Sequence, residues 1–164
     1  MAVRDGAGGF VLSGDEERVV RCLLDTFVPP LSEGEAVDIA WKAGVELEGR
    51  QLGGMVCGGS SEASVASFER SVNRLVASER SEVRLLLGLL GSAGGTAFLT
   101  GSLFSWAPFP RRSRAAREAN LLAMAASSVP LRRKAFNALK RLCCGVAALA
   151  LDGATKGCFN CTST

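Results

Sequence analysis

The residues of this chain that could bind a metal ion or undergo redox reactions are its six cysteines, at positions 22, 57, 143, 144, 158 and 161. Cys158 and Cys161 form a single CxxC pair. A zinc site needs a second pair or histidines, and the chain has no histidine. A redox pair would follow a strand and precede a helix, which the local sequence does not indicate. We therefore expect neither a metal site nor a redox centre, and free cysteines favour a reducing compartment.

Other catalytic chemistry finds little support in the composition. Without histidine the chain cannot build a Ser–His or Cys–His nucleophile pair. Gly6-Ala-Gly8 begins like a dinucleotide-binding turn, but no strand precedes it and position 11 is Val11 rather than glycine. We expect no catalytic, cofactor-binding or metal-binding residue in this chain.

The most conspicuous element is residues 85–110, which run for 26 residues without a charge between Arg84 and Arg111. About 20 apolar residues can cross a bilayer, but five glycines lower the hydropathy of this block. Two interpretations stay open: a span or deep insertion, and a pair of buried helices joined at 92–96. In a span, the positive-inside rule puts the C-terminal half in the cytoplasm; a block that enters and returns leaves both halves there.

Charge is divided unevenly along the chain. Residues 1–82 hold 8 basic and 14 acidic residues, a net of −6, and residues 83–164 hold 11 basic and 2 acidic ones, a net of +9. The basic half is expected to meet an anionic surface, either lipid head groups or the acidic half of the same molecule. Nucleic acid is not an expected partner, because no nucleic-acid motif is present. The candidate lipid contacts combine apolar residues of the block with nearby cations: Leu86, Leu87, Leu90, Phe98, Leu99, Leu103, Trp106, Arg111, Arg112, Arg132, Arg133 and Lys134.

Helical periodicity dominates the elements that would position these residues. Capping boxes at Ser13 with Glu16 and at Ser32 with Glu35 predict two helix starts, and Pro29-Pro30 ends the first helix. The expected helices cover 15–27, 33–43, 62–78, 81 onward into the uncharged block, 114–127 and 130–151. The fold class is mainly α, an irregular bundle of about six helices with a Gly-rich apolar segment that either enters a membrane or packs inside. Residues 1–12 and 152–164 are expected to be flexible tails around a helical domain at 13–151.

Several short motifs occur in a recognisable order. They are Asp25-Thr-Phe-Val-Pro-Pro30, Arg84-Leu-Leu-Leu-Gly-Leu-Leu-Gly91, Gly95-Thr-Ala-Phe-Leu-Thr-Gly-Ser-Leu103, Ser105-Trp-Ala-Pro-Phe109, Arg117-Glu118, Pro130-Leu-Arg132 and Phe136-Asn-Ala-Leu-Lys140. This series resembles the N-terminal region of plant-type long-chain-alcohol oxidases, flavoproteins of the glucose–methanol–choline oxidoreductase family. The resemblance implies a membrane-associating region of an enzyme that oxidises fatty alcohols to aldehydes with FAD and O₂.

The family's flavin-binding turn and catalytic histidine have no counterpart here, so the resemblance implies a fragment or detached module that holds no FAD. Its partners would be a lipid surface and the missing flavin domain or a partner subunit. The location would be an intracellular membrane, with the cytoplasm as the alternative. The Asp25-Thr-Phe-Val-Pro-Pro30 segment also resembles the small helical subunit of gluconate-dehydrogenase-type complexes. That second resemblance implies a non-catalytic assembly subunit.

Overall fold

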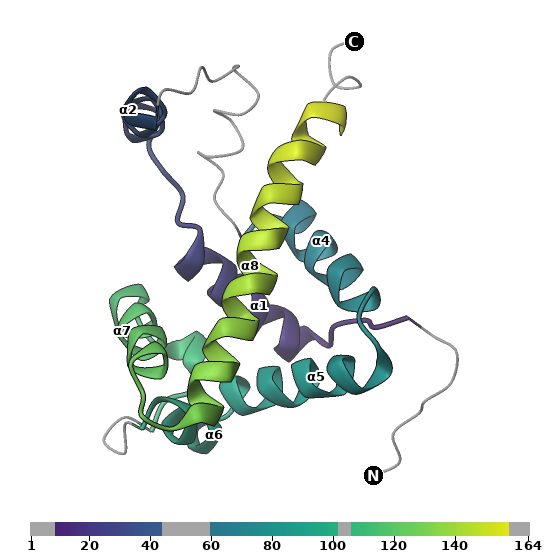
Figure 1. The fold of residues 1–164 in the computed structure, drawn as a ribbon, viewed down its shortest axis with the longest axis vertical. Helices are drawn as coiled ribbons and strands as arrows, with labels where there is room; N and C mark the ends of the chain where they lie inside the picture. Colours follow the sequence, from purple (N-terminus) through teal and green to yellow (C-terminus); the bar gives the residue numbers. More distant parts are fainter. Residues whose placement is uncertain (1–8, 44–59, 102–105, 158–164) are drawn as a thin grey trace.

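The computed structural model describes residues 9–43, 60–101 and 106–157. Within these ranges it contains seven α-helices, one short 3₁₀ helix and no strand, which confirms the mainly α class (Figure 1). The elements are α1 (Gly14–Phe27), α2 (Glu33–Ala43), α4 (Glu62–Asn73), α5 (Ala77–Gly91), α6 (Ala93–Thr100), η1 (Phe109–Arg111), α7 (Arg114–Ala125) and α8 (Pro130–Gly157).

The observed helix boundaries follow the local capping chemistry. Ser13 and Glu16 form the expected capping box of α1, and the hydroxyl of Ser32 hydrogen-bonds Glu35 at the start of α2. That bond and the backbone N–H of Ser32 hold the pKa of the Glu35 carboxyl below its usual value. The break between the two helices expected at 62–78 and from 81 onward lies earlier in the structure, at residues 74–76, because a new cap forms at Val76, whose N–H donates to the Glu79 carboxylate. α8 continues to Gly157, beyond the expected end at 151.

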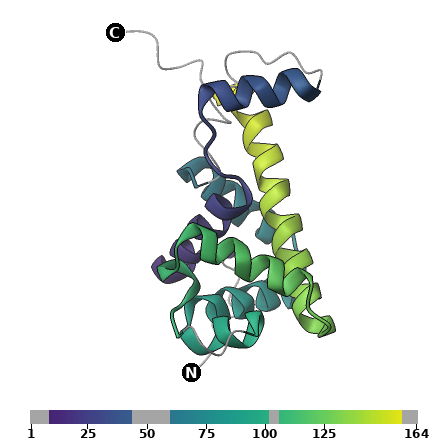
Figure 2. The ribbon, with the colours of Figure 1, turned by 90° about the vertical axis from the view of Figure 1, so that its left-hand side faces the viewer.

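Helix α1 lies at the centre of the bundle, with α4, α5, α7 and α8 arranged around it (Figures 1 and 2). Its apolar stripe is fully buried and meets the inner faces of the neighbouring helices. The largest buried side chains of this core are Val19, Val20, Leu23, Leu24, Phe68, Val72, Leu87, Leu90, Leu99, Phe109, Met124 and Leu139.

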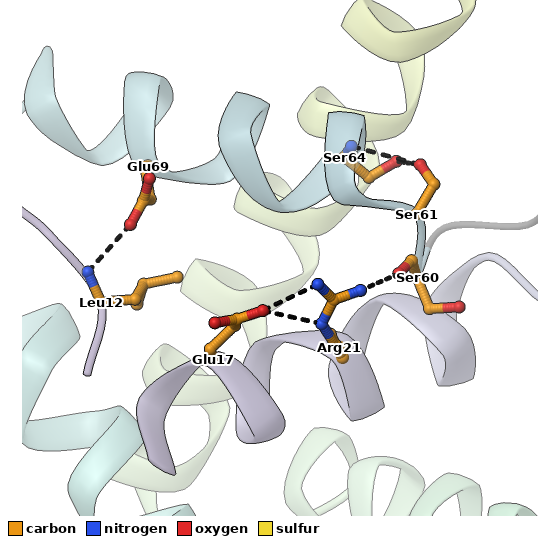
Figure 3. Close-up of polar contacts among 7 residues, drawn as sticks. All are labelled: Leu12, Glu17, Arg21, Ser60, Ser61, Ser64 and Glu69. Atoms are coloured by element: carbon orange, nitrogen blue, oxygen red, sulfur yellow. Dashed lines mark hydrogen bonds and ion pairs between the residues drawn. The ribbon is translucent and has the colours of Figure 1, made fainter. Parts of the chain in front are cut away.

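Polar contacts fix α4 against α1 and against the segment that precedes α1 in the sequence (Figure 3). Arg21 of α1 donates to the Ser60 carbonyl at 2.9 Å, and Glu17 orients its guanidinium through a 2.7 Å ion pair. On the other end of α4, Glu69 accepts a hydrogen bond from the Leu12 N–H at 2.9 Å. These contacts join regions separated by 39 and 57 positions in the sequence.

Residues 9–12 are bound to α4, which corrects the expectation that residues 1–12 are all loose. The side-chain amide of Asn73 accepts from the Phe10 N–H and donates to its carbonyl. The Phe10 ring is buried in the core, and the guanidinium of Arg84 lies 4.6 Å from its centroid. The apolar run from Phe10 to Leu12, directly before the Ser13 cap, is the sequence signal for this contact. Residues 1–8 lie outside the described part of the chain.

The uncharged block forms two helices that turn sharply at Ser92. No single helix of the described residues is long and apolar enough to cross a bilayer, whereas α5 and α6 together meet those requirements but are bent by 104°. The Ser92 hydroxyl caps α6 by accepting from the Gly95 N–H. Of the two interpretations of the block, the structure shows the pair of packed helices.

Thr96 and Gly95 allow the start of α6 to lie close against the end of α5 at this turn. The buried Thr96 hydroxyl lies 2.9 Å from the Leu90 carbonyl oxygen and accepts a hydrogen bond from the Phe109 N–H at 3.1 Å. At Gly95 a methyl group would lie 2.3 Å from the Leu89 carbonyl oxygen, so only glycine fits. Gly91 and Gly95 belong to separate helices. These two glycines, although four positions apart, therefore do not lie on one face of a continuous helix.

Candidate functional site

Three of the candidate lipid contacts lie inside the protein. Leu87, Leu90 and Leu99 are buried in the hydrophobic core because α5 and α6 turn their leucines toward α1. In this conformation they contact protein rather than lipid. Leu86 is half-buried, and Leu103 lies outside the described residues.

Two aromatic candidates remain on the surface near the α5–α6 turn. Phe98 is 54% exposed on α6, and Trp106 is 73% exposed in the connection to η1. The guanidinium of Arg132, in the first turn of α8, lies 5.9 Å from the Phe98 ring centroid. A methyl group on Gly101 would approach that guanidinium to 2.6 Å. Arg132 therefore covers the C-terminal end of α6, where a cation is favoured by the helix dipole.

The remaining cationic candidates differ in how they are held. Arg111, Arg133 and Lys134 are exposed. Arg112 is half-buried, because its guanidinium donates to the Ala107 carbonyl and to the Asn120 side-chain oxygen, both at 3.0 Å. The start of α8 and α6 lie at the same end of the molecule in Figures 1 and 2. That end therefore presents the exposed ring of Phe98 with the half-buried Arg132 against it, and exposed Arg133 follows Arg132 at the start of α8.

A groove of about 700 Å³ opens between α5, α6 and α8. Its walls are mostly aliphatic, and its charged lining residues are divided by helix. Glu79 and Glu82 lie on α5, whereas Lys134 and Arg141 lie on α8. The apolar lining residues are Leu75, Val83, Leu85, Leu86, Leu89, Phe98, Leu99, Leu131, Ala135, Ala138 and Leu142.

Of the residues that line this groove, the sequence identified only Leu86, Phe98, Leu99 and Lys134 as candidate contacts. It assigned Leu131 and Leu142 to the single apolar stripe of the last helix. The residues at 131, 134, 135, 138, 141 and 142 recur at three- and four-residue spacing, so they form a second face of α8. That spacing is the signal that could have identified the groove.

A buried polar cluster joins the end of α1 to α7. Arg117 donates to the Asp25 carboxylate at 2.6 Å, and both side chains are largely shielded from solvent. Arg117 Nε and Asn120 Nδ2 are buried without a hydrogen-bond partner in the structure. Among the described residues no three His, Cys, Asp or Glu side chains are placed to hold a metal ion. We interpret Asp25 and Arg117 as a structural tie between two helices.

The cysteines at positions 143 and 144 face opposite environments, as expected for neighbours on a helix. Cys144 is exposed, and Cys143 is buried in the core. Burial, with a smaller effect of Cys144, raises the pKa of the Cys143 thiol from 9.0 to about 12. Cys143 is therefore a neutral core residue at neutral pH. The Cys158 and Cys161 pair lies outside the described residues.

This buried thiol predicts a loss of stability in alkali. Above pH 9.0 the unfolded chain releases the Cys143 proton, whereas the folded protein keeps it until about pH 12. The folded state then binds more protons, so the free energy of unfolding should fall by about 1.4 kcal/mol per pH unit in this window. Urea unfolding between pH 8 and pH 11 measures the slope. Cys143→Ala should flatten it and Cys144→Ala should not; equal slopes in both variants would contradict the assignment.

Comparison with models of known protein families, with curated proteins and with solved structures finds no match for this chain.

Proposed function

We propose that this chain is a non-catalytic helical module that attaches to the surface of an anionic membrane. The attachment surface consists of Phe98, Trp106, Arg111 and Arg133, around the α5–α6 turn and the start of α8. The observations that carry the proposal are the exposure of Phe98, with the Arg132 guanidinium 5.9 Å from its ring centroid, and the exposure of Trp106 and Arg111 next to and within η1, which a hydrogen bond from Phe109 to Thr96 joins to α6. Amphipathic aromatic rings and cations are the groups that hold peripheral proteins at a lipid interface.

This attachment is peripheral, in keeping with the packing of the uncharged block. The leucines that would enter a bilayer interior are needed in the protein core. Surface binding leaves them there and uses only side chains that are already exposed. Each cation near an anionic surface contributes about 1 kcal/mol to binding.

We further propose, on the resemblance in the sequence, that the module is the N-terminal region of a long-chain-alcohol oxidase. In that role it would hold a flavin domain close to a membrane that contains poorly soluble fatty alcohols. FAD and the catalytic histidine would belong to the flavin domain. An assembly subunit like that of gluconate-dehydrogenase-type complexes is the second candidate, favoured by the exposed Trp41 on α2.

Binding to vesicles of stated composition tests the attachment surface. The Arg111→Gln/Arg133→Gln double variant should bind phosphatidylserine-containing vesicles about 2 kcal/mol more weakly than the wild type, because two surface charges are removed. The matched control is Arg70→Gln/Arg74→Gln at the C-terminal end of α4, a helix that lies away from α6 (Figure 1). Co-sedimentation at low salt measures the partition coefficient. Equal binding by the two double variants would contradict this surface.

A further inference from the structure

Helix α2 stands apart from the hydrophobic core. It follows Pro29-Pro30 and projects from the bundle in both ribbon views (Figures 1 and 2). Ala36 is buried, but no α2 residue belongs to the core cluster of the described residues. Val37 and Trp41, four residues apart on one face, are exposed, and Trp41 is 85% exposed. An exposed tryptophan on a short helix is a typical anchor of a protein–protein contact.

The groove between α5, α6 and α8 has dimensions that suit such a helix. On α8 its lining extends from Leu131 to Leu142, which corresponds to about 18 Å along a helix. α2 has 11 residues, which gives a length of about 16 Å. Grooves of this kind bind amphipathic helices through apolar side chains at three- and four-residue spacing.

The charges of α2 and of the groove are also complementary. α2 carries three carboxylates, at Glu33, Glu35 and Asp38, and one cation at Lys42. The α8 wall of the groove carries only cations, Lys134 and Arg141, whereas the α5 wall carries Glu79 and Glu82. Lys42 is already paired with Asp38 at 2.6 Å, so α2 presents mainly carboxylates, which complement the cations of the α8 wall. A lipid acyl chain has no charge along its length with which to do so.

We propose that α2 of one copy of this chain docks in the α5–α6–α8 groove of a second copy, and that the exchange is reciprocal. Each molecule contributes one helix and one groove, so a two-fold symmetric dimer satisfies both at once. In the single chain α2 stands apart from α8, toward the end of the molecule where α8 ends, whereas α5 and α6 lie at the end where α8 begins (Figures 1 and 2). Trp41 enters the groove as the anchor, between Leu85 and Leu131 at its rim. This goes beyond the proposed membrane attachment and does not depend on it.

Trp41 can report on this contact directly. The chain has two tryptophans, so Trp106→Phe leaves Trp41 alone. In lipid-free buffer the emission of this variant should shift to the blue as its concentration rises, in step with dimer formation in sedimentation velocity. Trp41→Ala should weaken the dimer about 1,000-fold, because the reciprocal exchange loses two anchors and each loss is worth about 30-fold.

Groove variants complete the test. Leu131→Asp should weaken dimerisation as strongly as Trp41→Ala, and Leu122→Asp, at an equally exposed leucine on α7, should leave it unchanged. Circular dichroism confirms that each variant is folded. A protein that stays monomeric at every concentration overturns the proposal, as does a dimer that Leu131→Asp leaves intact. Trp41 emission that is already blue-shifted at every concentration would overturn the proposal in another way, because it would mean that α2 docks within its own chain. Vesicle binding that Leu131→Asp abolishes in a monomer would mean that the groove takes lipid.

Discussion

Gly95→Ala should destabilise the protein by about 3 kcal/mol or more, because no space exists for a methyl group at the α5–α6 turn. The added carbon would lie 2.3 Å from the Leu89 carbonyl oxygen and 2.6 Å from the Leu89 Cα. Both are backbone atoms, so relief requires that α6 move away from α5. That movement would also strain the hydrogen bonds of the buried Thr96 hydroxyl.

Gly94→Ala is the matched control for this variant. It lies in the same helical turn, and a methyl group there meets no atom within 4 Å. It should be neutral or stabilise the protein by about 0.5–1 kcal/mol. Urea unfolding followed by circular dichroism measures both. The sign of the change in unfolding free energy distinguishes the two interpretations of the block. In a continuous helix through residue 92, alanine would stabilise the protein at both positions. Equal effects of the two variants would therefore contradict the sharp turn.

Asp25→Ala should cost about 3 kcal/mol, because it leaves Arg117 with its charge in a nearly buried position. The Arg117 side chain is 10% exposed and that of Asp25 is 28% exposed. Since Asp25 retains some solvent, the effect should fall toward the lower end of the range for broken buried pairs. Chemical unfolding at pH 7 provides the measurement.

Two further variants separate the buried pair from an ordinary surface pair. Asp25→Ala/Arg117→Met removes the unpaired charge and should recover part of the lost stability. Asp38→Ala breaks the exposed pair with Lys42 and should cost at most about 1 kcal/mol. A double variant less stable than Asp25→Ala would show that Arg117 stabilises the fold without its carboxylate partner.

The helices whose signals are local could be predicted from the sequence. Ser13 with Glu16 and the stripe from Val19 to Leu24 determine α1 by capping and periodicity alone. The break between α4 and α5 was predicted at residues 79–80 but lies at 74–76, because the cap at Val76 depends on the Glu79 side chain folding back onto its backbone. An apolar Val76 is a weak sequence signal for a helix start.

The uncharged block left two interpretations open because Leu87 and Leu90 suit a bilayer and a protein core equally well. In the structure both leucines lie in the protein core, and the bend between α5 and α6 that accompanies this packing depends on long-range contacts. The hydrogen bond from the Phe109 N–H to Thr96 spans 13 positions, and Gly95 matters only once Leu89 lies beside it. The candidate site was predicted only in part, because the groove also depends on contacts between residues far apart in the sequence. Trp106 and Arg133 were named from the sequence as candidate contacts, whereas the groove exists only because the fold brings α5, α6 and α8 around one space.

The central claim is that a folded helical bundle binds anionic membranes at their surface. Salt release from phosphatidylserine-containing vesicles tests it most directly, at neutral pH, where Cys143 does not titrate. At about 1 M salt the Debye length falls to about 3 Å, so contacts made through Arg111 and Arg133 should be screened. Protein that sediments with the vesicles at low salt and returns to the supernatant at high salt, with unchanged circular dichroism, is the expected result. Protein that never sediments with these vesicles, or that high salt does not release, would contradict the account.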